Sequence, residues 1–199
     1  MPKSYSEREK ALIKTRLKEE GRLLFSQYGM KKTTVDELVR RVNIPKGTFY
    51  LFYASKELLV FDLIMEEQAA IQAELLAAAA ALEHPISKES FSALLFDLYK
   101  RTTESFLFPI FTGGDYELIV RKLPDEALER NIEEDNDSIS RLFALIPQAR
   151  GKNMTVFSGA FRAIALLALH KNEIGAELFD DTLRLLIDGL SEKLFEVEL

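Results

Sequence analysis

The sequence predicts an all-α protein, and three observations support this fold class. Apolar residues recur about every 3.6 positions along the whole chain, whereas the strict alternation typical of strands is nearly absent. Hydrophobic residues make up 47% of the 199 positions, which is enough to build a core. Proline and glycine residues interrupt the pattern at intervals typical of helix ends. We expect about nine helices.

The first two helices are predicted from their end signals. A long helix should run from about Glu7 to Tyr28, because Gly29 is a suitable C-terminal stop. Thr34 and Glu37 then have the spacing of a capping box, in which each side chain bonds the other residue's backbone N–H. A short helix should therefore begin at Thr34 and end at about Arg41.

The third helix should begin at Pro45, because the first position of a helix does not need the N–H that proline lacks. It extends from Lys46 to about Phe52, which is only two turns. Ser55 can cap a fourth helix, which the apolar and alanine-rich pattern continues to about Leu82 before His84-Pro85 ends it.

The remaining chain has the same periodicity, with breaks at proline and glycine. It predicts five further helices, at residues 87–107, 114–122, 125–146, 152–171 and 176–196.

Charge is distributed unevenly between the two ends of the chain. Residues 1–60 contain 13 Lys and Arg against 7 Asp and Glu, whereas the other 139 residues contain 13 against 25. The net charge of −6 therefore hides a basic N-terminal part that could approach phosphates and an acidic body that they would repel. We expect a first domain at residues 1–55 and a second at residues 56–199.

Several classes of protein are disfavoured. The absence of cysteine excludes disulfides, thiolate metal sites and cysteine nucleophiles. The two histidines lie far apart, and no phosphate-binding glycine loop follows a predicted strand. The first residues lack the apolar stretch of a signal peptide, and the apolar run from Met154 to Leu169 is interrupted by Arg162. We expect a cytoplasmic protein with no catalytic residues, metal, cofactor or membrane span.

The second and third helices, with the first packed across them, predict a helix-turn-helix module. Such a module inserts the leading end of its second short helix into a DNA major groove, which is about 12 Å wide. Here that end is Lys46-Gly47-Thr48, which we expect to point outward. A glycine at position 47 suits close approach to a duplex, since any side chain there could block it.

This region resembles the DNA-binding signature of the tetracycline-repressor (TetR) family. The resemblance rests on TTVDELVRRVNIPKGTFYLFYASKELL, from Thr33 to Leu59, and on RLLFSQYG, from Arg22 to Gly29. It covers about the first 60 residues, whereas the rest of the chain agrees only in its number of helices and in ending with two apolar helices.

The resemblance implies roles for individual residues. Phosphate or backbone contacts would come from Thr34, Tyr50 and Lys56, and the recognition helix would enter the groove with Lys46, Gly47 and Thr48. The family often has His or Tyr where this chain has Phe52, which cannot donate a hydrogen bond. Tyr53 either supplies that contact instead or packs in the interior.

In this family the body dimerises through its last two helices, and the sequence independently favours such an interface. The helix before the last is apolar on almost every side from Val156 to Leu169, so other helices must pack against all of its faces. The last helix has a continuous apolar stripe, which predicts a four-helix interface between two copies. The stripe consists of Phe179, Leu183, Leu186, Ile187, Leu190 and Leu194. The alternative is that both helices are buried within one subunit.

The resemblance also implies a small-molecule ligand in the body. Aromatic residues there could line an apolar pocket with a few polar groups, or they could simply form the core. The candidate lining residues are Phe96, Tyr99, Phe106, Phe111, Tyr116, Phe143, Phe161 and His170.

The sequence thus predicts a homodimeric transcriptional repressor that binds a palindromic double-stranded operator and is released by a small, largely apolar inducer. The alternatives are a helical adaptor that binds only protein and an enzyme without DNA binding. Only the repressor should bind DNA in a sequence-selective and salt-sensitive manner.

Overall fold

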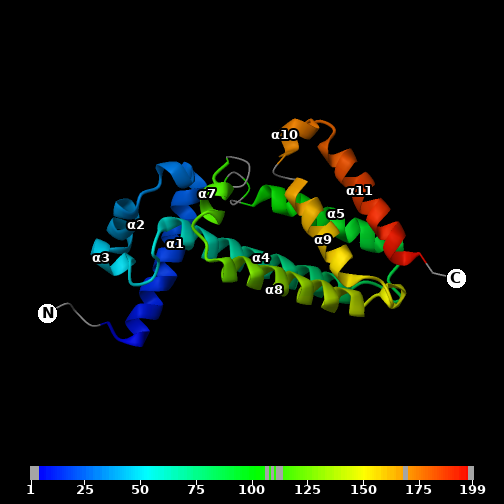
Figure 1. Ribbon diagram of the computed structural model, residues 1–199, viewed down its shortest axis with the longest axis horizontal. Helices are drawn as coiled ribbons and strands as arrows, with labels where there is room; N and C mark the ends of the chain where they lie inside the picture. Colours follow the sequence, from blue (N-terminus) through cyan, green and yellow to red (C-terminus); the bar gives the residue numbers. More distant parts are fainter. Residues whose placement is uncertain (1–4, 106–107, 109, 111–113, 168–169, 197–199) are drawn as a thin grey trace. The chain divides into compact units, whose positions relative to one another are not determined.

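Helices form all the regular secondary structure in the residues that the computed structural model describes, which are 5–105, 108, 110, 114–167 and 170–196. The prediction of an all-α fold is confirmed (Figure 1). The α-helices are α1 (Glu7–Lys32), α2 (Val35–Val42), α3 (Lys46–Phe49), α4 (Lys56–Ala80), α5 (Lys88–Glu104), α7 (Tyr116–Val120), α8 (Asp125–Ala144), α9 (Met154–Leu167), α10 (Lys171–Ile174) and α11 (Phe179–Phe195), and residues Pro147–Ala149 form a 3₁₀ turn.

Each of the nine predicted ranges contains a helix, whereas the short helix α10 was not predicted as a separate element. Two boundaries near the N-terminal end differ for identifiable reasons. Gly29 does leave helical geometry, with a φ of 74°, yet a short turn continues α1 to Lys32. The α-helical part of α3 ends at Phe49, and tighter i→i+3 bonds continue it. These bonds join Leu51 N to Thr48 O (3.2 Å) and Phe52 N to Phe49 O (2.9 Å).

The chain divides into two compact units, each described separately below. The first comprises residues 1–66 and 109–123, and the second comprises residues 67–108 and 124–199. The division falls inside α4 and not at residue 55, where we expected it. The physical reason is that Leu59, Val60 and Leu63, in the first turns of α4, are fully buried.

The first unit is built around side chains that α1, α2, α3 and α4 all contribute. α1 begins with a capping box between Ser6 and Glu9, which the sequence analysis did not identify. The fully buried side chains include Leu17, Leu24, Phe25, Met30, Leu38, Phe49, Leu59 and Leu63. This core fixes the two short helices, α2 and α3, which bury too little surface to be stable alone.

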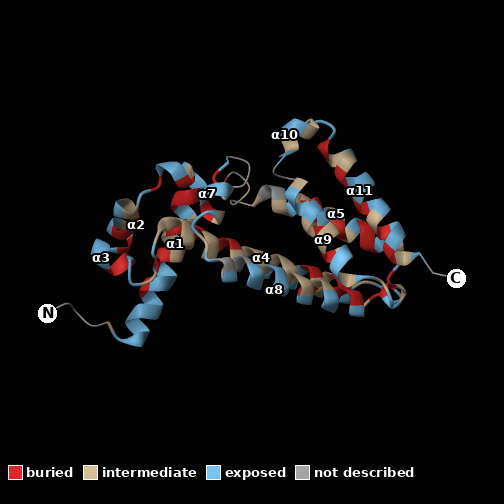
Figure 2. Cartoon of the chain, viewed as in Figure 1, coloured by how far each residue is buried: buried red, intermediate tan, exposed pale blue. Residues whose placement is uncertain are grey.

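The second unit has its own apolar core, drawn from α5, α8, α9 and α11 (Figure 2). Phe91, Phe143 and Phe161 meet edge to face, with ring centroids 6.3–6.5 Å apart for the pairs that include Phe161. α11 packs against both α5 and α9.

This packing corrects the predicted dimer stripe on α11. Phe179, Leu183, Ile187 and Leu194 are at most 2% exposed, so they belong to the interior of the subunit and have no surface for a partner. Leu190 is half-buried, and only Leu186, which is 41% exposed, faces outward. The apolar stripe was identified correctly, but α11 buries it against its own subunit.

None of the helices in the described ranges has the combination of length and apolarity that crossing a membrane requires.

Candidate nucleic-acid interface

The helix-turn-helix begins at Thr34, which caps α2. The Thr34 hydroxyl accepts a hydrogen bond from Glu37 N at 3.2 Å, as predicted, so its own hydrogen can still be donated outward. The capping box predicted that the Glu37 carboxylate accepts from Thr34 N. The carboxylate instead lies 3.7 Å from the Arg40 guanidinium, with which it forms an ion pair.

The turn between α2 and α3 depends on Asn43 and Pro45. Asn43 ends α2 in the left-handed region with a φ of 58°, a conformation that asparagine tolerates better than most residues. Ile44 N still reaches Val39 O at 3.0 Å, and Pro45 O accepts from Thr48 N at 2.9 Å to start α3. Pro45 thus stands immediately before the helix, one position earlier than expected.

Phe49 anchors α3 in the core of the first unit. Its ring is fully buried and contacts Tyr50 edge to face (5.4 Å) and Tyr53 in a tilted arrangement (6.0 Å). Helix α3 therefore has one buried side, whereas Lys46, Gly47, Tyr50 and Leu51 are exposed on the other.

The leading end of α3 presents Gly47 and Lys46 to solvent. A Cβ atom at position 47 would meet no atom within 4 Å, so folding itself does not require glycine there. The Lys46 ammonium lies 3.0 Å from the Asp36 carboxylate of α2, and this hydrogen bond raises the pKa of Lys46. Lys46 is therefore a positive charge at the exposed edge, and DNA would have to compete with Asp36 for it.

Two residues predicted to contact DNA are turned inward. Thr48 is 6% exposed, and its hydroxyl lies 3.4 Å from the Tyr5 hydroxyl. Tyr53 is also 6% exposed, and its hydroxyl donates to Asp62 at 2.7 Å. Of the two alternatives for Tyr53, the structure therefore favours interior packing, because Phe49 holds the ring and Asp62 holds the hydroxyl.

Lys56 has a structural role that the sequence did not indicate. Its ammonium donates to the carbonyls of Met30 (2.6 Å) and Thr33 (2.8 Å), and so ties the start of α4 to the end of α1. An ammonium group has three donors, which leaves one hydrogen for a phosphate.

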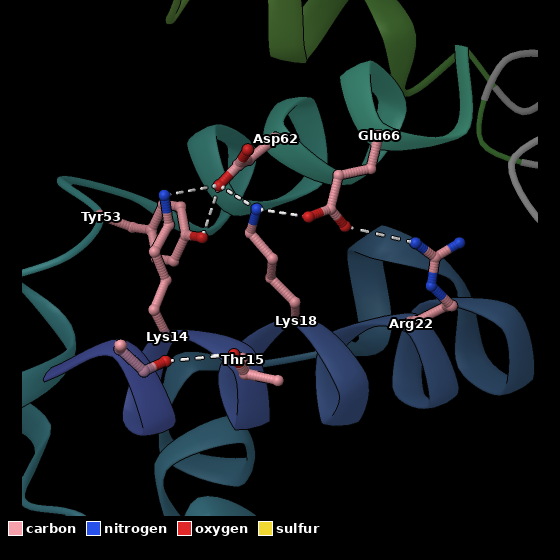
Figure 3. A network of polar contacts seen from close by, with 8 residues as sticks. Lys14, Thr15, Lys18, Arg22, Tyr53, Asp62 and Glu66 are labelled. Atoms are coloured by element: carbon pink, nitrogen blue, oxygen red, sulfur yellow. Dashed lines mark hydrogen bonds and ion pairs between the residues drawn. The ribbon is translucent and has the colours of Figure 1, made fainter. Parts of the chain in front are cut away.

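A charged network connects α1 with α4 in this unit (Figure 3). Lys14 and Lys18 lie 3.2 and 2.8 Å from the same oxygen of Asp62, and Lys18 also lies 2.7 Å from Glu66. Burial alone would raise the pKa of Asp62, but hydrogen bonds from Lys18 and Tyr53 outweigh it and hold that pKa below its ordinary value. Asp62 is therefore ionised at neutral pH.

The sequence pattern gave no indication of Asp36, Asp62 or Leu51. Leu51 is a large apolar side chain that is 70% exposed on the tight turn after α3. The two carboxylates act through partners distant in sequence, so spacing along one helix gave no signal for them. The i, i+4 spacing of Lys14 and Lys18 on α1 was visible, but it did not indicate which acid they face.

The predicted ligand residues do not form one site. Tyr99, Phe143 and Phe161 lie together in the core of the second unit, where the Tyr99 hydroxyl donates to Phe161 O at 2.8 Å. Phe96 is half-buried beneath the Arg184 guanidinium, 3.9 Å from its ring centre.

The other predicted ligand residues are placed elsewhere. Tyr116 belongs to α7 in the first unit, and Phe106 and Phe111 lie outside the described residues. His170 is exposed and lies 4.0 Å from Glu173, at the start of α10 and not at a helix C-terminus. Its exposure removes it from any buried pocket.

Comparisons with known proteins agree with this geometry. Residues 19–63 match the family model described as bacterial regulatory proteins, tetR family. Over 58 residues the chain is 40% identical to YuxN, an uncharacterized HTH-type transcriptional regulator of Bacillus subtilis (strain 168). The match covers 29% of this chain and 18% of that protein, so it is confined to one region of each.

Solved structures resemble the chain over almost its whole length. A TetR-family transcriptional regulator from Pectobacterium atrosepticum has a TM-score of 0.68 at 15% identity, covering 96% of this chain and 95% of that one. RolR in complex with resorcinol has a TM-score of 0.57 at 16% identity, covering 98% of both chains. At these identities the likeness establishes a shared fold. Together with the match at residues 19–63 to the tetR-family model, it supports a transcriptional regulator of this family.

Proposed function

We propose that this regulator is a homodimeric repressor that binds a palindromic operator and is released by a small, largely apolar ligand. The observation that carries the proposal is the exposed leading end of α3, where Lys46 and Gly47 face solvent above the buried Phe49. Major-groove recognition needs a short helix that packs one face against the core and exposes the other face to solvent.

The contacts follow from which side chains still have donors to offer. Lys46 would enter the groove beside Gly47, while Thr34 and Lys56 each retain a hydrogen for a phosphate. Tyr50 is 51% exposed, so its hydroxyl can reach the DNA backbone. Thr48 and Tyr53 are left out of this set, because both are buried.

The dimer would form through the exposed faces of α9 and α11. Large apolar side chains remain uncovered on both helices, and exposed apolar surface of this kind is typical of a protein interface. These side chains are Val156 and Leu166 on α9, Leu178 immediately before α11, and Leu185 and Leu186 on α11. Two copies of each helix would give a four-helix interface about a two-fold axis.

A two-fold axis has a consequence for the operator. Two copies of α3 would bind successive major grooves about 34–36 Å apart on one face of the duplex, which requires an inverted repeat. DNA binding also implies that the protein acts in the cytoplasm.

The ligand would bind in the second unit, near Tyr99, Phe143 and Phe161. This part of the proposal is supported by their aromatic packing and by the fold shared with RolR, which was solved with resorcinol. A ligand that binds only the arrangement with wrongly spaced α3 helices would release DNA. A thermal-shift screen of small aromatic compounds, resorcinol among them, tests this part.

The DNA-binding part is tested by selecting duplexes from a random pool and measuring affinity at several salt concentrations. Lys46→Ala should lower the affinity for the selected duplex by about tenfold or more and reduce the salt slope by about 1. Lys193→Ala removes the same charge from the acidic body, where Lys193 pairs with Glu196, and should match the wild type. Failure to enrich any sequence, or equal behaviour of the two variants, would contradict the proposal.

A further inference from the structure

One side chain, that of Tyr53, connects α4 to the recognition segment, which we define as α3 and the tight turn after it (residues 46–53). The Tyr53 ring packs against Phe49 of α3, whereas its hydroxyl donates to Asp62 two turns into α4. Burial and the Asp62 carboxylate together raise the pKa of Tyr53 well above its ordinary value, so the hydroxyl keeps its proton and remains a donor.

Asp62 receives three donors from two parts of the first unit. Tyr53 brings the end of the recognition segment to it, while Lys14 and Lys18 bring α1 (Figure 3). All three groups meet the same carboxylate oxygen, at 2.7–3.2 Å. The Asp62 side chain is only 29% exposed, so water competes poorly for these hydrogen bonds and ion pairs.

Glu66 lies one turn further along α4 and provides a natural comparison. It pairs with Lys18 at 2.7 Å and with Arg22 at 3.4 Å, so it also neutralises the basic face of α1. Its partners all belong to α1, whereas Asp62 also holds Tyr53. The two acids thus have the same charge and a shared lysine, but only one of them is connected to α3.

We propose that Asp62 is a positioning residue for DNA recognition, which holds the recognition segment in its DNA-binding orientation through Tyr53 while α1 fixes the carboxylate from the other side. This inference rests on the proposed DNA-binding function. Asp62 touches no DNA in this account and acts only by orienting α3.

The sign of the expected effect separates positioning from simple electrostatics. An acidic residue in a DNA-binding unit repels phosphates, so its removal should tighten binding to every duplex if charge alone matters. If Asp62 positions α3, its removal should weaken binding to the selected sequence while binding to unrelated DNA holds or rises. The informative quantity is therefore the ratio of the two affinities.

The test measures that ratio by fluorescence anisotropy, using a duplex selected by the wild type and a scrambled duplex at one salt concentration. Asp62→Asn should lower the ratio by about tenfold, the effect of losing a charge-assisted hydrogen bond. Tyr53→Phe keeps the ring and removes only the hydroxyl. It should lower the ratio by about threefold, a smaller effect because the lysines still hold the carboxylate. The double variant should be no worse than Asp62→Asn, since both changes break the same bond.

Glu66→Gln is the matched control, because it removes the same charge without touching Tyr53. It should shift both affinities in the same direction and leave the ratio near the wild-type value. A ratio that Asp62→Asn leaves unchanged, or that Glu66→Gln lowers equally, overturns the inference. If Asp62→Asn fails to fold, Tyr53→Phe decides, and an unchanged ratio overturns the inference. A wild type that selects no sequence would instead overturn the proposed function, and this inference with it.

Discussion

Helices in both units bury one face in the core and expose the other, but the exposed faces differ in chemistry between the two units. In α3 the fully buried Phe49 is followed by Tyr50, which is exposed, and in α11 the exposed Leu186 is followed by Ile187, which is fully buried. Each helix uses one face for its own core, and the other face remains available. On α3 that face carries a lysine and a glycine and is followed by the phenol of Tyr50, whereas on α11 it includes two adjacent leucines, Leu185 and Leu186, among charged residues.

The helix face that the core leaves exposed, and not the apolar stripe itself, therefore indicates the kind of partner. A polar and flat edge suits a hydrated, charged duplex, and an apolar face suits another protein. The most regular apolar pattern in the body therefore indicates the subunit core, and the interface must be sought among apolar residues outside that pattern.

Replacing Leu185 and Leu186 together by Glu should have the largest effect. Both leucines are exposed in the subunit, so the variant should fold normally, but a dimer would bury two carboxylates from each subunit without partners. We expect the dissociation constant of the dimer to rise at least about 100-fold, with loss of tight DNA binding. Analytical ultracentrifugation measures the first effect.

Ile132→Glu provides the control for that variant. Ile132 is an exposed apolar residue on α8 and belongs to neither α9 nor α11, so the change of an exposed apolar side chain to Glu there should leave dimerisation intact. If the α11 variant stays as dimeric as the control, the α9–α11 interface is wrong.

Leu183→Ala should affect folding and leave dimerisation intact. Leu183 is 2% exposed in the subunit core, and a large-to-small change at such a site costs about 2–5 kcal/mol of unfolding free energy. Urea unfolding measured at several protein concentrations separates this loss from weaker association. Unchanged stability combined with a weaker dimer would return Leu183 to the interface.

Gly47→Ala should separate folding from recognition in the first unit. The added methyl meets nothing within 4 Å, and alanine favours a helix, so the unfolding free energy should stay constant or rise by up to about 1 kcal/mol. The same methyl would obstruct close approach to base edges and lower affinity for the selected duplex by about tenfold. Full affinity would show that position 47 does not approach the DNA.

Asp36→Asn should have the smallest effect, in the opposite direction. It removes an acid that pairs with Lys46 at 3.0 Å and faces the proposed duplex, so DNA affinity should rise by about threefold at low salt. The gain should shrink as salt is raised, because exposed charges are screened. An affinity that falls would mean that Asp36 orients Lys46 for recognition.

Sequence alone predicted the helices of both units, because periodicity and end signals are local. Thr34, Pro45 and Ser55 each mark a helix start within one residue of its place in the structure, and Gly29 marks the kink three residues before α1 ends. The resemblance at Thr33–Leu59 agrees with the match of residues 19–63 to the tetR-family model.

The parts that sequence did not predict depend on contacts between distant residues. Tyr53 is held by Asp62, Lys56 by carbonyls at the end of α1, and Thr48 lies against Tyr5. Likewise, the amphipathic pattern of α11 shows that it has an apolar face but not whether that face meets its own subunit or another.

Binding of a dimer to a two-fold operator is tested by determining how many subunits bind a selected duplex and where they contact it. Mass measurement of the complex should give two subunits on one duplex, and the selected sequences should contain an inverted repeat with half-site centres one helical turn apart. Footprinting should protect two successive major grooves on one face of the DNA. A single subunit bound to a site without two-fold symmetry would contradict the account.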